Sequence, residues 1–261
     1  MNKQNSGCLG KVLKSTRNHY LVKTDSAVFK CIVRGRVAGG AATELSAVKV
    51  GDDVWVQPLS ATEGAIQKIL PRRSKLSRAV EGKAYREHII AANIDQMIII
   101  MSTKQPEFKS GLLDRYLVIA EKNCLKSVIC LNKIDLADRL IFQETARWYN
   151  KLDYPFHFTS ALTGEGMEEF RTFLVGKVSV LVGHSGVGKS SMIQKIEPSV
   201  KLKVADISQK TNKGKHSTSY VELFPLSFGG YLIDTPGIRE LGLWDIFRNE
   251  LKRYFKEFCK F

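Results

Sequence analysis

The sequence predicts two folded parts, a small all-β barrel and a larger α/β domain, followed by a short helical segment. Short strands separated by turns fill residues 1–72, whereas apolar strands alternate with helices in residues 73–243. A glycine-rich stretch at 183–190 lies between one of these strands and a helix, which is typical of phosphate-binding loops. We therefore expect domains at 1–72 and 73–243 and the helical segment at 244–261.

The composition favours a basic cytoplasmic protein. The 261 residues include 40 Lys or Arg and 26 Asp or Glu, which gives a net charge of +14. This surplus suits nucleic acid, although it also suits a merely basic surface. No apolar run approaches the roughly 18 residues of a membrane span, and the N-terminus lacks a signal-peptide pattern. The five cysteines are scattered and form no Cys-x-x-Cys pair, which favours a reducing compartment.

The first 72 residues predict a five-stranded barrel, for which the OB-fold is the best candidate. The expected strands are 9–13, 20–22, 27–33, 54–56 and 66–70, with a tight turn at 50–54. In the third strand Phe29, Cys31 and Val33 fall on one face, and Lys30 and Arg34 fall on the other.

Basic side chains of this barrel are candidates for RNA contact, and they are Lys30, Arg34, Arg36 and Lys49. The alternative is that these charges only keep a small barrel soluble. Residues 71–78 are basic, begin with a proline and lack periodicity, so we expect a linker there.

The α/β part predicts a parallel sheet covered by helices. The expected strands are 96–101, 127–131, 156–161, 177–182, 221–224 and 230–233, the last two paired. The expected helices are 112–122 with Ser110 as N-cap, 138–151, one capped by Thr163 that buries Met167, Phe170 and Leu174, and 191–196.

The glycine-rich stretch reads G-x-x-x-x-G-K-S and continues into a further serine. Its residues are Gly183, His184, Ser185, Gly186, Val187, Gly188, Lys189, Ser190 and Ser191. A strand–loop–helix of this kind aims backbone N–H groups at phosphate oxygens. Lys189 would reach the β- and γ-phosphates, and the Ser190 hydroxyl would bind Mg²⁺. A glycine-rich turn that ends in Lys-Ser by chance is the alternative.

Residues 132–135 read N-K-x-D directly after an apolar strand. The Asp135 carboxylate matches the adjacent ring N–H and amino group of guanine, which adenine lacks. Asn132 can bond the base edge and tie this loop to the phosphate loop, and the Lys133 stem can lie over the base. Ser160 and Ala161 end a later strand, where the Ala161 N–H could donate to the six-oxygen of guanine. Each pattern alone is a weak signal.

The remaining candidates lie in a polar loop at 203–219 and in the D-x-x-G pattern at 234–237. We expect Thr218 to bind Mg²⁺ and the γ-phosphate, with Ser217 as its near rival. Asp234 can hold Mg²⁺ through water, and the Gly237 N–H can meet the γ-phosphate. His216 is a candidate to position the attacking water, although contact with solvent or RNA is an equal alternative.

Four such motifs, each after an apolar strand, predict a site for GTP or GDP with Mg²⁺. In an ordinary GTPase the phosphate loop comes first, whereas here N-K-x-D and S-A precede it. The predicted fold class is therefore α/β, a circularly permuted P-loop GTPase domain preceded by a small all-β OB-fold barrel, with a short helical C-terminal segment. Strand neighbours rather than chain order set the packing of a sheet, so the fold tolerates this permutation.

The sequence resembles the small ribosomal subunit biogenesis GTPases (RsgA, also called YjeQ) along essentially its whole length. The permuted order and the stretches 183–191, 214–219 and 234–240 carry the resemblance. It implies a monomeric cytoplasmic enzyme that binds the small (30S) ribosomal subunit and its rRNA, assists late maturation and hydrolyses GTP with stimulation by that subunit. It also implies a C-terminal zinc domain with three cysteines and a histidine.

The sequence departs from this family at its C-terminal end, and from many other GTPases at Ile238. Only Cys259 is available as a zinc ligand, and one thiolate cannot build a tetrahedral site, so zinc is expected only with C-terminal ligands absent from this sequence. Ile238 stands where many GTPases have a water-orienting Gln, so intrinsic hydrolysis should be slow. Two other functions remain open: a permuted GTPase of the large subunit, and an RNA-binding assembly factor whose nucleotide is structural.

Overall fold

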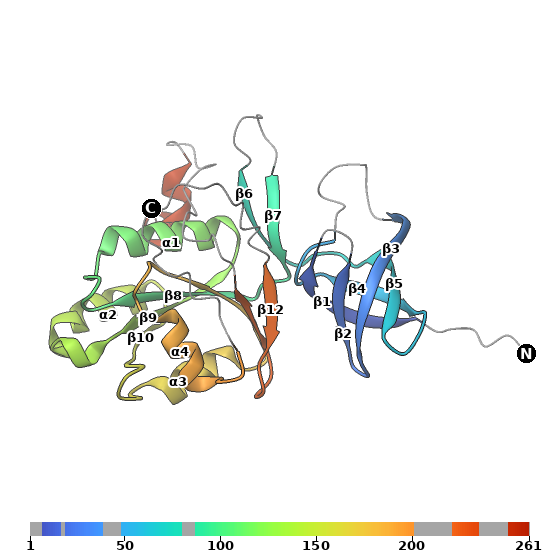
Figure 1. Cartoon of the computed structure of the whole chain (residues 1–261). Coiled ribbons are helices and arrows are strands. Elements are labelled where there is room, and N and C mark those ends of the chain that lie inside the picture. Colours follow the sequence, from blue (N-terminus) through green and yellow to red (C-terminus); the bar gives the residue numbers. More distant parts are fainter. Residues whose placement is uncertain are drawn as a thin grey trace, which may run out of the picture. The chain divides into compact units, whose positions relative to one another are not determined.

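The computed structural model describes residues 7–16, 19–38, 48–79, 87–200, 221–234 and 250–260. Within these ranges only the backbone is described for residues 34–38, 78, 79, 87, 88, 234, 259 and 260. The chain divides into two compact units, and we treat each by itself (Figure 1). The first unit holds residues 1–94 and 220–223, and the second holds 95–219 and 224–261.

The first unit contains a closed five-stranded barrel, as the sequence predicted. Its strands are β1 (Cys8–Ser15), β2 (Tyr20–Thr24), β3 (Val28–Ala38), β4 (Asp53–Pro58) and β5 (Glu63–Ile69). Each strand pairs with the next in the order β1-β2-β3-β5-β4, and β4 returns to pair with β1. Of these five strand pairs only β3–β5 is parallel, and the other four are antiparallel. This arrangement is that of an OB-like barrel.

Alternating side chains fill this barrel. Phe29 and Cys31 of β3 are buried and Lys30 is exposed, which agrees with the predicted faces. They pack in a cluster with Val12, Val22 and other residues of β1, β2 and β4. Because β-branched and apolar residues on one face of each strand point inward, the barrel closes around a dry core.

Two strands of the first unit were not predicted. β6 (Lys75–Ala79) and β7 (Glu87–Ala92) form an antiparallel pair, and β6 lies within the stretch 71–78 that we expected to be a linker. Partly buried polar bonds flank this pair: the Ser74 hydroxyl donates to the Ile94 carbonyl, and the Arg73 N–H donates to Asn93 Oδ1 at 2.8 Å. Leu76 of β6 and Ile89 and Ala91 of β7 are buried. In β6 a single large apolar side chain stands among polar and basic residues, so its sequence shows no strand pattern.

The second unit is built on a parallel sheet. Its strands are β8 (Gln96–Ser102), β9 (Lys126–Asn132), β10 (Phe156–Phe158), β11 (Val178–Val182) and β13 (Tyr231–Asp234), in the order β10-β9-β8-β11-β13. All four neighbouring pairs are parallel. Every residue of β8 is buried, as expected for a central strand covered on both faces. β12 (Glu222–Pro225) neighbours β13 in the strand order, which agrees with the predicted pairing.

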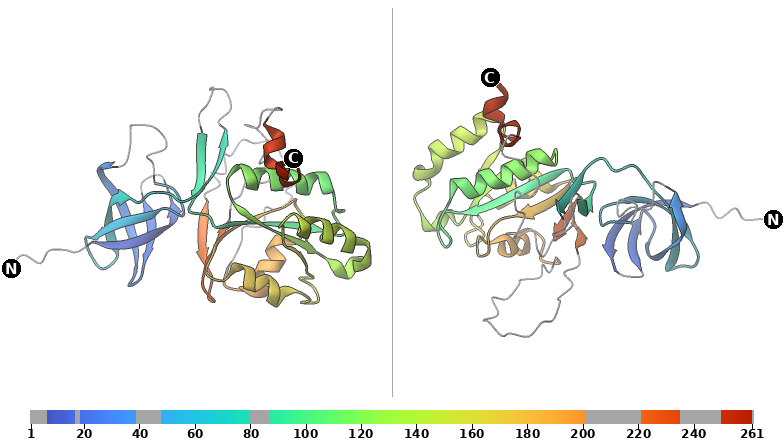
Figure 2. Two further views of the ribbon diagram at one scale, coloured as in Figure 1. Left: turned by 180° about the vertical axis from the view of Figure 1, so that it is seen from behind. Right: turned by 90° about the horizontal axis from the view of Figure 1, so that it is seen from above.

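Helices cover both faces of this sheet (Figures 1 and 2). α1 (Ser110–Lys122) and α2 (Gln143–Lys151) lie on one face, and α3 (Met167–Leu174) and α4 (Lys189–Ile196) lie on the other. Met167, Phe170 and Leu174 are buried, as predicted, and join Met192 and Ile193 of α4 in one core cluster. This core fixes α4 beneath the sheet and so fixes the loop from which α4 starts.

The predicted helix starts were wrong. Ser110 is the first residue of α1 rather than its N-cap, which is Lys109 and makes no side-chain capping bond. Gly166, at φ 70°, is the N-cap of α3, so Thr163 does not cap it. The helix expected at 138–151 is divided into a 3₁₀ turn, η3 (Arg139–Phe142), and α2. A glycine in the left-handed region can turn the chain into a helix without a capping side chain, which the expected Ser/Thr pattern cannot reveal.

The described end of the chain is helical, but not as one α-helix. Residues 250–260 contain two 3₁₀ turns, η5 (Leu251–Tyr254) and η6 (Lys256–Lys260). The helical spacing of Trp244, Phe247, Leu251, Phe255 and Phe258 predicts an apolar stripe along this segment. Leu251 and Phe255 are partly buried, whereas Phe258 is exposed, so the described part of the stripe is only partly covered. Trp244 and Phe247 lie outside the described residues. No helix among the described residues combines the length and the apolar character needed to cross a membrane.

Candidate nucleotide-binding site

The loops that carry the sequence motifs leave the same edge of the sheet. β8, β9, β10 and β11 are parallel, so the segments that follow them begin side by side. The carboxyl edge of an open parallel sheet is where such folds bind ligands. The described part of this edge carries residues 102–106, 132–135, 159–161 and 183–190.

The phosphate loop has the predicted strand–loop–helix context. It joins β11 to α4, and Gly183, Gly186 and Gly188 have φ values of 147°, 83° and 98°. A Cβ at Gly183 would lie 2.2 Å from the Ile100 carbonyl oxygen of the neighbouring strand. Only glycine therefore allows this tight approach, which turns the loop so that the start of α4 presents its N–H groups.

Lys189 curls over this loop. Its Nζ donates to the carbonyl oxygens of Gly183 at 2.7 Å and His184 at 2.8 Å. The ammonium group thus lies where a phosphate held by the loop would meet it. Ser190 is partly buried in the first turn of α4, and His184 is exposed with its Nδ1 2.9 Å from the Ser185 carbonyl oxygen.

Asn132 joins the phosphate loop to the two base-recognition motifs. Its Nδ2 donates to the Val187 carbonyl oxygen at 2.9 Å. Its Oδ1 accepts from the Ala161 N–H at 3.1 Å and from the Thr159 hydroxyl at 3.4 Å. The side chain is 1% exposed, so these bonds form in a region shielded from water. The predicted tie between N-K-x-D and the phosphate loop is therefore present.

Gly188 makes this tie possible. A Cβ there would lie 2.3 Å from Asn132 Nδ2, far inside any real contact. The glycine thus serves two purposes, the left-handed turn into α4 and the close passage of the asparagine amide. The spacing of the motif fixes the first purpose, but only the folded structure shows the second.

Asp135 and Ser160 also lie together. The Ser160 hydroxyl donates to Asp135 Oδ1, and Asp135 is exposed within the short 3₁₀ turn η2 (Ile134–Leu136). The other carboxylate oxygen has no hydrogen bond among those found in the described residues. A carboxylate oriented by one serine at the rim of a loop can accept further N–H donors from a planar base.

Lys133 is held in an unusual backbone conformation. Its φ is 62°, in the left-handed region that a non-glycine residue adopts only at a cost. The Thr103 hydroxyl donates to the Lys133 carbonyl oxygen at 2.6 Å, and the Lys133 ammonium donates to the Gln105 carbonyl oxygen. The segment after β8 therefore supports the N-K-x-D loop from beneath.

Three buried hydroxyl side chains behind the motif loops were not predicted from the sequence. Ser102, Thr103 and Thr159 are buried, and each follows or ends an apolar strand. The Ser102 hydroxyl donates to the Pro106 carbonyl oxygen at 2.6 Å, which holds the turn after β8. A polar pair at the end of a fully apolar strand is the signal that could have identified Ser102 and Thr103.

Some predicted site residues cannot be placed. His216, Ser217, Thr218 and Gly237 lie outside the described residues. Asp234 is described only as the last backbone position of β13, which runs parallel to β11 with Ile233 opposite Val180. The end of β13 therefore lies beside the strand that leads into the phosphate loop.

The described residues suit a nucleotide with Mg²⁺ and do not suit zinc. The phosphate loop offers backbone N–H groups at its closely packed glycines and the Lys189 ammonium group to phosphate. The Ser190 hydroxyl at the start of α4 is a suitable ligand for Mg²⁺. In the described part of the chain no three potential metal ligands cluster, and the side chain of Cys259 is not described. Burial raises the pKa of the Cys130 thiol, which therefore packs as a neutral residue in β9.

The chain matches the family model described as RsgA GTPase over residues 69–244. It is 39% identical to the small ribosomal subunit biogenesis GTPase RsgA of Caldanaerobacter subterraneus subsp. tengcongensis, over 97% of this chain and 80% of that protein. It is 41% identical to the protein of the same name from Chlorobaculum parvum, over 100% of this chain and 86% of that protein.

Two solved structures are similar along almost the whole chain. The crystal structure of YjeQ from Thermotoga maritima matches with a TM-score of 0.76 and 34% identity, over 97% of this chain and 82% of that one. The structure of YloQ, described as a circularly permuted GTPase, matches with a TM-score of 0.75 and 27% identity, over 100% and 82%. The permuted motif order, the OB-like barrel and these relatives agree: the chain belongs to the RsgA family of circularly permuted GTPases, enzymes of ribosome biogenesis that hydrolyse GTP.

Proposed function

We propose that the chain binds GTP and GDP across the loops at the carboxyl edge of the sheet. Asp135 accepts from the ring N–H and amino group of guanine, the Ala161 N–H donates to the six-oxygen, and the stem of Lys133 lies over the base. The phosphate loop, residues 183–191, surrounds the phosphates with its N–H groups, and Lys189 contacts the β- and γ-phosphates.

The single observation that carries this proposal is the bonding of Asn132. One buried side chain joins the N-K-x-D strand end, the S-A loop and the phosphate loop by bonds of 3.1 Å or less. The base-recognition loops and the phosphate loop are joined by the hydrogen bonds of this one buried side chain. Because movement of one loop would strain the others, we infer that they bind the same ligand.

Mg²⁺, when bound, neutralises charge on the β- and γ-phosphates. The Ser190 hydroxyl, the Thr218 hydroxyl and, through water, the Asp234 carboxylate would hold it, and the Gly237 N–H would meet the γ-phosphate. His216 positions the attacking water. Ile238 cannot orient water, so the chain alone hydrolyses GTP slowly, and a partner must order the site.

We further propose that this partner is the small ribosomal subunit. The relatives are named small ribosomal subunit biogenesis GTPases, and a net charge of +14 suits an rRNA surface. Lys30 is exposed on the barrel. It contacts rRNA phosphates in this function, together with Arg34, Arg36 and Lys49 of the same region. In this function a cytoplasmic monomer joins the 30S subunit late in its maturation, and contact with the subunit accelerates hydrolysis.

The test is the rate of GTP hydrolysis at one fixed salt concentration, with purified small subunits, with large subunits and with neither. We expect small subunits alone to raise the rate, and the Lys189→Ala variant to stay inactive throughout. Equal stimulation by large subunits would contradict the choice of partner. A rate that no subunit changes would indicate an RNA-binding assembly factor with a structural nucleotide instead.

A further inference from the structure

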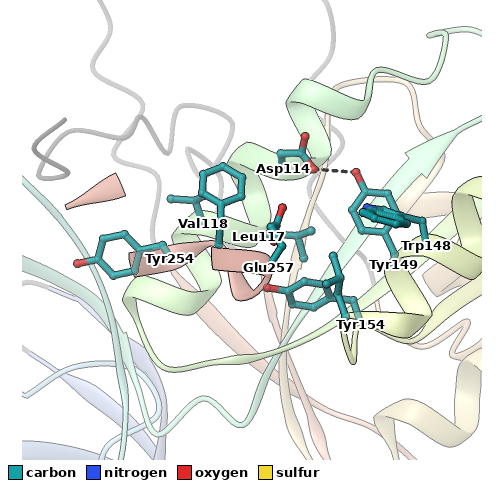
Figure 3. A pocket seen from close by; sticks show the side chains of 10 residues that line it. Asp114, Leu117, Val118, Trp148, Tyr149, Tyr154, Tyr254 and Glu257 are labelled. Carbon is teal, nitrogen blue, oxygen red and sulfur yellow. Dashed lines mark hydrogen bonds between the residues drawn. The ribbon is translucent and has the colours of Figure 1, made fainter. Parts of the chain in front are cut away.

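A cavity of about 110 Å³ lies in the second unit where α1 and α2 meet the C-terminal turns (Figure 3). Asp114, Leu117 and Val118 come from α1, and Trp148 and Tyr149 come from α2. The remaining lining residues follow α2 or lie in and between the two 3₁₀ turns, and they are Leu152, Tyr154, Tyr254, Phe255 and Glu257. None of these residues contributes to the nucleotide site.

The lining has the opposite charge to the rest of the chain. It contains five aromatic rings and two carboxylates, and none of its ten residues is basic. The whole sequence has 40 Lys or Arg against 26 Asp or Glu, so an acidic pocket is a local exception. Aromatic faces and carboxylates both attract cations, which makes a positively charged group the complementary ligand.

The two carboxylates, Asp114 and Glu257, line the same pocket. The Tyr149 hydroxyl donates to Asp114 Oδ1 at 2.7 Å (Figure 3). Burial, this hydrogen bond and the charges of Asp114 and Glu257 raise the pKa of Tyr149, so the phenol stays neutral and donates to Asp114. The hydrogen bond also orients Asp114, which leaves its other oxygen available to a second donor.

A neighbouring lysine, Lys256, already contacts an aromatic ring and a carboxylate at the edge of this pocket. Lys256 Nζ lies 3.9 Å from the centroid of the Tyr154 ring and 3.5 Å from Glu121 Oε1. The Tyr154 hydroxyl donates to Glu121 at 3.0 Å, so ring, carboxylate and ammonium form one unit. An aromatic ring beside a carboxylate therefore already binds a cation at this position in the fold.

The size of the cavity excludes large ligands. Sites for whole small molecules and cofactors typically measure about 300–1,000 Å³, whereas a cavity of about 150 Å³ holds a benzene ring. At about 110 Å³ this pocket accommodates the end group of a side chain but not a nucleotide. A planar guanidinium group can stack on a ring while it donates to two carboxylates, whereas a lysine ammonium cannot make the stacked, bidentate contact.

We propose that the pocket formed by Asp114, Trp148, Tyr149, Tyr254 and Glu257 binds the guanidinium group of an arginine side chain on a basic segment of a partner protein. This inference does not depend on the proposed function, because the nucleotide loops and the pocket share no residue. It identifies a second, protein-directed contact surface on the α1–α2 face of the GTPase domain.

The test uses the whole chain and a short probe peptide, acetyl-Gly-Arg-Gly-amide, followed through the indole N–H resonances of the three tryptophans. Trp148 is assigned with the Trp148→Phe variant, and Trp55 of the barrel serves as an internal reference. We expect the Trp148 resonance to shift saturably, with a dissociation constant in roughly the millimolar range for one side chain. The same peptide with neutral citrulline in place of arginine should give no shift.

Two conservative variants test the carboxylates. Asp114→Asn and Glu257→Gln keep an acceptor oxygen but remove the charge, so each should weaken the arginine peptide by roughly tenfold. Glu250→Gln removes a charge just before the C-terminal turns without touching the lining, and should leave binding unchanged. The Trp55 resonance and the thermal midpoint show whether each variant is folded.

Three outcomes would overturn the proposal. Equal binding of the citrulline peptide would exclude recognition of the charge. Unchanged binding by both folded carboxylate variants would exclude this pocket as the site. Tighter binding of free spermidine than of the arginine peptide would assign the pocket to a polyamine rather than to a protein side chain.

Discussion

Asn132 and Gly188 show how closely the residues of the site depend on one another. The asparagine amide bonds the Val187 carbonyl oxygen because the next residue has no side chain to block it. A motif written as letters records both residues but not their contact. Because of this contact, a change at Gly188 in the phosphate loop should also disturb the position of the N-K-x-D loop, which we propose binds the guanine base.

Gly188→Ala should weaken GDP binding by about tenfold or more. Its Cβ would meet Asn132 Nδ2 at 2.3 Å, and its φ of 98° is unfavourable for alanine. Gly176→Ala is the matched control, because Gly176 has a φ of 69° but no heavy atom within 4 Å of the added Cβ. Titration of GDP with each variant checks the prediction, and equal affinities for the two would show that the contact is unimportant.

Asp135→Asn should lose guanine recognition and gain xanthine recognition. The asparagine amide would present a donor to the donors of guanine, whereas xanthine offers a carbonyl oxygen in place of the amino group. We expect GDP affinity to fall by about a hundredfold or more while XDP affinity rises. Asp138→Asn keeps the cap of η3 and should change neither affinity. An unchanged preference for GDP over XDP in Asp135→Asn would refute the assignment.

At the scale of elements, apolar strands were predictable and polar connections were not. β8, β9 and β11 are almost fully buried runs whose composition alone indicates a central sheet. β6 is held by its pairing with β7 and by the buried Leu76, and neither leaves a repeating pattern in the sequence of the strand. The start of α3 was missed for a similar reason, since Gly166 replaces the side-chain cap.

A largely buried ion pair stabilises the connection between the barrel and β6. Arg72 contacts Asp52 through Nε at 2.7 Å and Nη2 at 2.8 Å, and the Asp52 side chain is 0% exposed. Arg72→Met leaves this charge uncompensated and should lower the free energy of unfolding by about 3 kcal/mol. The exposed Lys68→Met change should cost little, and urea unfolding measures both. A loss no greater in Arg72→Met than in Lys68→Met would contradict the prediction.

The end of α4 should make stability depend on pH. Glu197 accepts from the Ser199 hydroxyl and, at 2.7 Å, from the Ser227 N–H, and these bonds lower its pKa from 4.5 to about 2. The stabilisation is therefore fully present above about pH 4.5 and is lost as the pH falls toward 2. Wild type should exceed Glu197→Gln in unfolding free energy above that window, and the excess should vanish below it.

Unfolding free energies at a series of pH values between 2 and 6 test this prediction, with the exposed Glu169→Gln on α3 as control. The control should follow wild type through the window. A difference between wild type and Glu197→Gln that stays constant across the window would contradict the role of the carboxylate.

At the scale of the whole molecule, the sequence predicted the barrel, the permuted GTPase domain and the tie between N-K-x-D and the phosphate loop. These features follow from apolar periodicity and from the rule that parallel strands end at one edge. The acidic–aromatic pocket could not be predicted, because Asp114, Trp148 and Glu257 are far apart in the chain and meet only through the packing of α1, α2 and the C-terminal turns. The division of residues 250–260 into two 3₁₀ turns escaped prediction for the same reason.

The central claim is that separate loops of the sheet bind a single guanine nucleotide. A crystal structure with Mg²⁺ and a non-hydrolysable GTP analogue tests it most directly. The account predicts both Asp135 oxygens within about 3 Å of the guanine ring N–H and amino nitrogens, and Lys189 Nζ at the β- and γ-phosphates of the same molecule. Guanine bound without Asp135, or phosphates bound away from Lys189, would contradict the account.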